Sequence, residues 1–348
     1  MKQRILTVIA LLAVCALVII GYNQSDLSSL QSSDEPITIT DYKLNTYVTI
    51  TIYDSTDTTL LNDCMALCDK YELLFSRTNP ESELYQLNHG NLPISEDGYY
   101  TVSDELFEII KTGKEYSMLS DDAFAIALEP LTSLWNFTDG TNIIPAQDDV
   151  DAVLPLLNSA NIQLRSPNKI RFEKEGMGID LGGIAKGYIA DKIKEYLLSK
   201  DVHSALIYLG GNVLCIGQKE SGPFKIGIEK PFDTDGKAAA IIQISDVSVV
   251  TSGTDERYFE KDGKFYHHIL DKNTGYPINN NLTAVTIITA SSTDADALST
   301  TCFSLGLTKG LELLESLDNT EGFFITEDGE YHYTDGFAEK YLLEINRS

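Results

Sequence analysis

The segment 177–191, MGIDLGGIAKGYIAD, brings a carboxylate, two adjacent glycines and an ammonium group close together. Asp180 lies between apolar residues, Gly182 and Gly183 follow it, and Lys186 stands where a helix is predicted to begin. Glycines at a helix entrance let backbone groups approach a ligand closely, and a helix N-terminus favours an anion. The segment therefore indicates a phosphate site. It is neither a dinucleotide fingerprint nor a P-loop, so an ordinary tight turn explains it at least as well.

A second segment, 293–301 (TDADALSTT), precedes an apolar stretch and is predicted to be helical. Asp296 and Thr300 are four residues apart, so on a helix they share one face. A carboxylate and a hydroxyl suit Mg²⁺, which keeps water or phosphate oxygens as its other ligands. The alternative is a helix start enriched in acidic residues, which carries no ligand.

A histidine pair, His267 and His268, stands in the segment 265–270, which is predicted to be a strand. Neighbouring strand residues face opposite sides of a sheet, so only one of the two imidazoles can point into a given site. The pair gains chemical meaning only through its neighbours.

The N-terminus is typical of a membrane-targeting element. Lys2 and Arg4 precede an apolar run over 5–21. Residues 1–23 are interpreted as an uncleaved anchor, a cleaved signal or a lipoprotein leader with Cys15 as the lipidated residue. Residues 24–35 are polar and predict a flexible tether. Because positive residues stay cytoplasmic, residues 36–348 are expected to form the folded domain, on the extracytoplasmic face of the cell membrane.

The composition limits the classes of partner. With 348 residues, 43% of them hydrophobic, the chain can bury one large core or two modest ones. The formal charge of -26 repels phosphate backbones, so no nucleic-acid partner is expected. Cys64 and Cys68 stand on the apolar face of a predicted helix, which favours two buried small side chains over a metal or redox site.

Hydrophobic periodicity predicts an α+β fold, with strand runs interrupted by segregated helices. Helices are predicted over 60–75, 103–116, 148–158, 184–199, 294–305 and 309–316. Strands are predicted over 41–53, 162–165, 169–173, 205–209, 213–216, 224–228, 239–244, 247–251, 265–270 and 284–289.

Several of these segments, taken in order, resemble the FAD:protein FMN transferases, the ApbE family. The likeness is carried by 180–191, by 209–212 (LGGN), by 252–253 (SG), by 268–271 (HILD) with 274–275 (TG), and by 295–300 (ADALST). Upstream, 75–77 (FSR), 82–84 (SEL), 87–88 (LN), 130–131 (PL) and 134–137 (LWNF) are similar too. The resemblance covers about 42–306 and implies a single large domain with a T-shaped α+β core.

The resemblance also implies the reaction. The enzyme would use Mg²⁺ to transfer FMN from FAD to a Ser or Thr hydroxyl of an exported acceptor protein and would release AMP. It implies metal ligation by the backbone carbonyl of Gly183 and by Asp296 and Thr300, with Ser299 as an addition. His268 would be the catalytic base, with Asp255 as a second candidate. It places FAD against Leu44, Ala123, Phe124, Ala125, Asp180, Lys186, Ser252, Gly253 and Ile269.

Three departures from the family pattern keep other outcomes open. Phe124-Ala125-Ile126-Ala127 replaces Phe-Asp-Pro-Thr, Thr78 replaces an aromatic residue, and Lys272 replaces a proline after Asp271. An FAD pyrophosphatase, with water as the acceptor, would use the same site. A membrane-attached flavin-binding protein without turnover is the alternative that the missing Asp and Thr favour.

Overall fold

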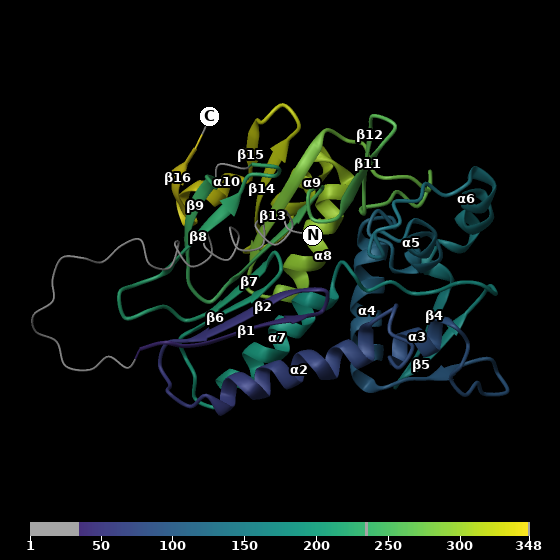
Figure 1. The fold of residues 1–348 in the computed structure, drawn as a ribbon, viewed down its shortest axis with the longest axis horizontal. Coiled ribbons are helices and arrows are strands. Elements are labelled where there is room, and N and C mark those ends of the chain that lie inside the picture. Colours follow the sequence, from purple (N-terminus) through teal and green to yellow (C-terminus); the bar gives the residue numbers. More distant parts are fainter. Residues whose placement is uncertain (1–34, 234–235, 347–348) are drawn as a thin grey trace, which may run out of the picture.

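An eight-stranded antiparallel sheet forms the centre of the computed structural model, which describes residues 35–233 and 236–346 (Figure 1). The strands follow the spatial order β1-β2-β6-β7-β10-β13-β14-β15. They span Ile37–Lys43 (β1), Thr46–Ile52 (β2), Ala205–Leu209 (β6), Asn212–Ile216 (β7), Ser248–Gly253 (β10), Leu282–Thr289 (β13), Glu321–Thr326 (β14) and Tyr331–Tyr333 (β15). The order brings strands from both halves of the chain into one sheet.

Helices cover one face of this sheet and a small sheet covers the other. The helices are α2 (Thr59–Phe75), α7 (Ala185–Leu198), α8 (Ser292–Leu305) and α9 (Leu307–Glu315). The small sheet, of order β16-β9-β8, consists of Leu342–Ile345, Ala238–Ile244 and Phe224–Glu229 and is joined by α10 (Asp335–Lys340). Along β13, Val285 and Ile287 pack with the α8 side chains, whereas Ala284 and Ile288 pack with the small sheet. This alternation follows from the two-residue period of a strand buried on both faces.

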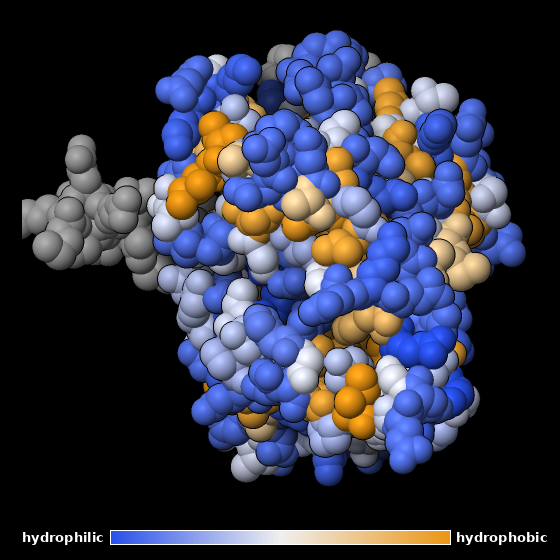
Figure 2. Space-filling view, turned by 90° about the vertical axis from the view of Figure 1, so that its right-hand side faces the viewer, coloured by the Kyte–Doolittle hydropathy of each residue, from blue (hydrophilic) through white to orange (hydrophobic). Residues whose placement is uncertain are grey.

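A third region lies beside the end of the large sheet. It contains α3 (Glu83–Asn88), α4 (Asp104–Leu119), α5 (Glu129–Trp135), α6 (Gln147–Val153) and the sheet β3-β5-β4, made of Tyr100–Thr101, Lys169–Phe172 and Ile162–Arg165. A separate hairpin joins β11 (Tyr258–Lys261) to β12 (Lys264–His267). Hydrophilic residues cover most of the face seen in Figure 2, and hydrophobic residues form separate groups on it.

The predicted α+β class is confirmed, as are most of the predicted helices. Ser103 caps α4, and its side chain accepts a hydrogen bond from the Leu106 amide. Cys64 and Cys68 are fully buried on α2 and are not joined by a disulfide, as expected for small core side chains.

Three predicted elements were wrong in detail. The segment 41–53 is a hairpin rather than one strand, because Leu44 and Asn45 adopt φ of 54° and 57° and form the two-residue turn between β1 and β2. The predicted helix 148–158 ends early, and a short 3-10 turn containing Pro155 follows α6. The strand predicted over 265–270 ends at His267.

Residues 1–23 and most of the tether lie outside the described residues, so their predicted roles stay predictions. Within the described part, no helix has the length and apolar character needed to cross a membrane.

Candidate active site

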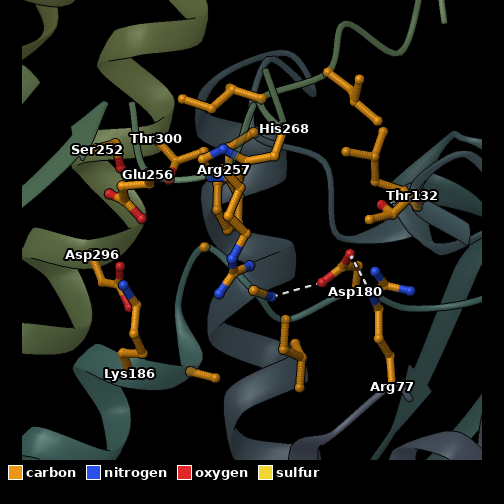
Figure 3. Close-up of a pocket in the computed structure, with 18 of the residues that line it drawn as sticks. Arg77, Thr132, Asp180, Lys186, Ser252, Glu256, Arg257, His268, Asp296 and Thr300 are labelled. Atoms are coloured by element: carbon orange, nitrogen blue, oxygen red, sulfur yellow. Dashed lines mark hydrogen bonds and ion pairs between the residues drawn. The ribbon is translucent and has the colours of Figure 1, made fainter. Parts of the chain in front are cut away.

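A pocket opens where α7 and α8 meet the β1–β2 turn, the end of α2 and the loops that follow α4, β10 and β12. Figure 3 shows side chains from these segments facing one another around a common space. Twelve of the predicted site residues line it: Leu44, Ala123, Phe124, Ala125, Asp180, Gly183, Lys186, Ser252, His268, Ile269, Asp296 and Thr300. The pocket thus gathers residues from distant parts of the chain.

The three residues assigned to the cation come together. Asp296 and Thr300 lie one turn apart on α8, and Gly183 lies beside that face. A Cβ atom at Gly183 would be 3.1 Å from Thr300 Oγ1 and 3.0 Å from the Phe124 ring, so only glycine brings this backbone so close to the helix. Asp296 is 3% exposed, which places its carboxylate deep in the pocket wall.

Close packing of α7 against α8 fixes the position of Asp296. The Gly187 backbone amide donates a 2.8 Å hydrogen bond to Asp296 Oδ2. A Cβ at Gly187 would stand 2.2 Å from the Ser292 carbonyl oxygen, so a larger residue would force the helices apart. Asp191 of α7 also caps α8, because its carboxylate accepts hydrogen bonds of 2.9 and 2.8 Å from the Ser292 and Thr293 amides.

The hydroxyl groups of Ser252, Ser299 and Thr300 lie close together. Ser252 Oγ lies 2.7 Å from Ser299 Oγ and 3.2 Å from Thr300 Oγ1, and Ser299 donates to the Asp296 backbone carbonyl at 2.8 Å. Ser299 is fully buried and already has partners for its hydroxyl, whereas Thr300 reaches the pocket. Ser299 therefore holds neighbouring groups in place through hydrogen bonds and does not itself face the pocket.

Burial raises the pKa of Asp296, and the nearby Lys186 ammonium and Gly187 amide oppose that rise. Asn212 is fully buried beside it, and its side chain interacts with the Asp296 carboxylate and lowers its pKa, although neither polar atom of Asn212 reaches full hydrogen-bond geometry. In the described residues, the other buried side-chain atoms without a partner are Asp122 Oδ1 and His268 Nδ1, both from residues that line the pocket. Buried polar atoms are seldom left unpaired, so this clustering favours a polar ligand here.

The two histidines separate as predicted. His267 Nε2 lies 2.9 Å from the Ile278 carbonyl oxygen, which gives this imidazole a structural partner, whereas His268 lines the pocket. Burial, together with the positive charges of Arg257 and Lys186, lowers the pKa of His268 to about 3. The imidazole is therefore neutral at ordinary pH, and in the ligand-free pocket it is a weak base.

Two predicted residues, Asp255 and Gly253, lie outside this pocket and line an adjoining groove. The Asp255 carboxylate accepts a hydrogen bond from the Phe232 backbone, and burial raises its pKa. Both residues follow Ser252, but the chain turns away there as β10 ends. The structure thus favours His268 over Asp255 as the group that faces the pocket.

The departures from the family pattern fall in different places. Ala125 lines the pocket, whereas Ala127 is fully buried in the main core and does not reach it. The threonine that the family pattern has in place of Ala127 would therefore lie in the core and not in the pocket wall. Lys272 lines the pocket and forms a 3.6 Å ion pair with Asp122.

Four cationic side chains line the pocket, and sequence reasoning assigned a role to only one of them. Arg77 pairs with Asp180 at 3.2 Å, as Figure 3 shows, and Lys272 pairs with an acid as well. Lys186 donates to the Gly210 carbonyl oxygen at 2.8 Å, and neither it nor Arg257 forms an ion pair with a described carboxylate. Arg77 belongs to the quoted 75–77 motif, but nothing in the sequence marked Arg257 as part of the site.

Comparisons with known proteins agree with this geometry. The family model described as "ApbE family" matches residues 44–324. An FAD:protein FMN transferase of Klebsiella pneumoniae is 38% identical over 277 residues, covering 79% of this chain and 84% of the relative. One from Treponema pallidum is 33% identical over 297 residues, with 80% of each chain covered.

Solved structures give the same result. The crystal structure of the ApbE protein from Thermotoga maritima superposes with a TM-score of 0.79 at 30% identity, covering 87% of this chain and 98% of that one. The flavinyl transferase ApbE of Pseudomonas stutzeri, in its apo form, gives 0.77 at 29% identity and covers 90% and 98%. The matched residues include every side chain of the pocket described above, and the chain therefore belongs to the ApbE family.

Proposed function

We propose that this ApbE-family transferase moves FMN from FAD to a Ser or Thr hydroxyl of an acceptor protein and releases AMP, in a reaction that depends on Mg²⁺. Flavin transfer is the activity named for its curated relatives. The acceptor hydroxyl, the cation and the leaving group are the parts that the pocket chemistry supports.

The observation that carries the proposal is the convergence of charge in one pocket. Lys186 and Arg257 have no carboxylate partner among the described residues, and Figure 3 shows both side chains directed into the same space as Asp296. Two unpaired cations beside a buried carboxylate suit an anion that brings a cation with it, such as a diphosphate with Mg²⁺. A guanidinium presents its donors in a fork that matches phosphate oxygens.

The residues at the cation site fit Mg²⁺. No three His, Cys, Asp or Glu side chains of the described residues converge on one point, so the site offers at most two such ligands, Asp296 and the nearby Glu256. Mg²⁺ is commonly held in this way, by one or two carboxylates together with water and substrate phosphates. The Thr300 hydroxyl and the backbone of Gly183 supply further oxygens. When bound, the ion would neutralise the charge that builds on the diphosphate as AMP departs.

The protein side chains divide the remaining work. Lys186 and Arg257 hold the diphosphate and orient its phosphorus atoms. His268 accepts the proton of the incoming hydroxyl, whose oxygen then bonds to the FMN phosphorus. The low pKa of His268 makes it a weak base in the ligand-free pocket, and a bound diphosphate would offset the charges of Arg257 and Lys186 that help to lower that pKa. Asp180, held by Arg77, stands on the opposite side of the pocket and is placed to bind the rest of FAD.

The cellular setting is part of the proposal. The basic and apolar character of residues 1–23 supports attachment to the cytoplasmic membrane, with the domain on its outer side. The acceptor would then be an exported protein.

One assay tests the reaction. The full-length protein in detergent would be incubated with FAD, Mg²⁺ and Ser- or Thr-containing peptides, and both AMP and covalently bound flavin would be measured. AMP together with flavin-labelled peptide supports transfer. AMP and free FMN alone would indicate a pyrophosphatase, and FAD binding without AMP would indicate a flavin-binding protein; either result would refute the transferase proposal.

A further inference from the structure

A groove adjoins the active-site pocket and opens into it. Its walls are the end of β8 (Ile226 to Glu229), the glycine turn between β6 and β7, and the end of β10. The pocket and the groove share the lining residues Asn45, Lys186, Thr251, Glu256 and Arg257. The junction therefore lies at the two cations that we assign to the diphosphate.

The groove runs along the edge of β8. This strand is the last in the order β16-β9-β8, and in the described part of the chain it pairs with β9 alone. Four consecutive residues, 226 to 229, line the groove. Because alternate strand residues face opposite sides, contact with all four indicates that the groove follows the backbone edge rather than one face. An unpaired edge offers amide and carbonyl groups to another extended segment.

Three exposed aromatic side chains form a cluster close to the groove, and two of them are next in sequence to residues that line it. Phe232, Tyr258 and Phe265 are 48%, 45% and 39% exposed, and their ring centroids lie 5.3, 5.5 and 4.9 Å apart. Pro231 and Arg257, the residues just before Phe232 and Tyr258, line the groove. Exposed aromatic residues that gather in this way are typical of interaction surfaces.

The backbone holds this aromatic cluster in place. Phe232 adopts φ of 62°, a left-handed conformation that is rare for a bulky residue. The Asp255 carboxylate, on the groove wall, accepts a hydrogen bond from the Phe232 backbone. The opposite wall carries Tyr208, which is 38% exposed. The groove therefore has the aromatic cluster close to one wall and the partly exposed Tyr208 on another.

We propose that this groove binds an extended segment of the acceptor protein, which adds to the edge of β8, places an apolar side chain on the aromatic cluster and presents its Ser or Thr hydroxyl to the pocket. The inference rests on the proposed function and names the partner of the same site. The hydroxyl oxygen bonds to the FMN phosphorus, the bond from that phosphorus to the AMP oxygen breaks, AMP keeps the electron pair, and the hydroxyl proton passes to His268. FAD supplies both the FMN that is transferred and the AMP that leaves, so no further reactant is needed.

The first test removes the aromatic cluster. The probe is a pool of synthetic twelve-residue peptides with one central threonine and random flanking residues. The triple variant Phe232→Ser, Tyr258→Ser and Phe265→Ser should lower kcat/KM for peptide labelling by roughly 10- to 100-fold, because exposed aromatic anchors carry much of the affinity of an interface. The FAD affinity, and the rate of AMP release when water replaces the peptide as acceptor, should stay near the wild-type values.

A matched control carries Ile94→Ser and Met118→Ser, at side chains that are 59% and 71% exposed and line neither cavity. It should label peptides at the wild-type rate. Equal labelling by the triple variant and the control would overturn the docking proposal. A wild-type protein that labels no peptide contradicts the proposed function itself, whether or not it releases AMP, whereas the docking proposal alone fails when the wild type labels peptides and the triple variant labels them equally well.

The second test addresses strand addition. The best-labelled peptide would be resynthesised with N-methyl groups on either of the two alternating sets of amides. An added strand bonds to an edge through only every second residue, so one set should reduce labelling at least tenfold and the other should not. Equal labelling of both methylated peptides would exclude pairing along β8.

Discussion

Replacing Gly187 with alanine should damage the active site through the contact between α7 and α8. The added Cβ would stand 2.2 Å from the Ser292 carbonyl oxygen and 2.8 Å from Asp296 Cβ, whereas ordinary contacts begin at 3.4 Å. Neither neighbour can rotate away, because one is backbone and the other is the first side-chain atom. The two helices must therefore separate by about 1.2 Å at this point, which shifts Asp296 and lengthens its 2.8 Å bond to the Gly187 amide.

The expected effect on stability is small and the effect on activity large. Overpacking costs about 1–3 kcal/mol and alanine improves helix propensity by about 1 kcal/mol, so the free energy of unfolding should fall by about 0–2 kcal/mol. A displacement of about an ångström at a reacting centre, in contrast, can reduce the rate roughly 10²-fold. AMP release should fall by that order and require more Mg²⁺ for half-maximal activity, while FAD binding should be largely retained.

Gly310→Ala provides the matched control. Gly310 is also a helical glycine, in α9, and its Cβ would lie 2.9 Å from the Phe324 ring and 3.1 Å from the Cys302 carbonyl oxygen. This contact is milder than the one at Gly187 and lies away from the pocket, so the variant should disturb helix packing without losing AMP release. The reasoning fails if Gly187→Ala keeps the wild-type rate and Mg²⁺ requirement, or if both variants lose activity equally.

Three further changes test separate parts of the proposal. Asp296→Ala should abolish Mg²⁺-dependent AMP release, since it removes the buried carboxylate that we assign to the cation; release at the normal rate would exclude this residue as a ligand. His268→Ala should slow transfer by roughly 10² to 10⁴ while sparing FAD binding. Because the His268 pKa lies near 3, its imidazole stays neutral between pH 5 and pH 8. The pH profiles of kcat/KM for the wild type and for His268→Ala should therefore have the same shape near pH 6.5, the ordinary pKa of histidine. Cys15→Ser should abolish membrane attachment if that thiol carries a lipid, and unchanged attachment would indicate a helical anchor instead.

Hydrophobic periodicity predicted the helices that carry the site better than it predicted several of the strands. Helices 184–199 and 294–305 correspond to α7 and α8, so the shared face of Asp296 and Thr300 followed directly from their spacing. The strands β11, β14, β15 and β16 were not predicted. These strands have three to six residues each and show no clear alternation, and β14 and β16 take their strand conformation from pairing with β13 and β9, which are distant in the chain.

The pocket residues divide in a similar way. Asp180 and Lys186 could be assigned because they stand in one short motif. Arg257 could not, since its place depends on how the loop after β10 folds back over the pocket. Asp255, two residues earlier, was given the role of a second base because sequence distance does not show that its carboxylate points into the groove and binds the Phe232 backbone.

The strongly acidic chain and the cationic pocket are compatible because electrostatic interactions are screened over different distances. At physiological ionic strength the Debye length is about 8 Å, so exposed carboxylates on remote surfaces contribute little at the pocket. Lys186 and Arg257 lie in the pocket wall, where a bound diphosphate would be within hydrogen-bonding reach and screening is weaker. Asp180 and Asp122 hold the other two cations, Arg77 and Lys272, in ion pairs, which leaves this pair to meet the ligand. The local arrangement therefore decides which anions bind, and the net charge acts mainly on macromolecules whose phosphates extend across the acidic surface.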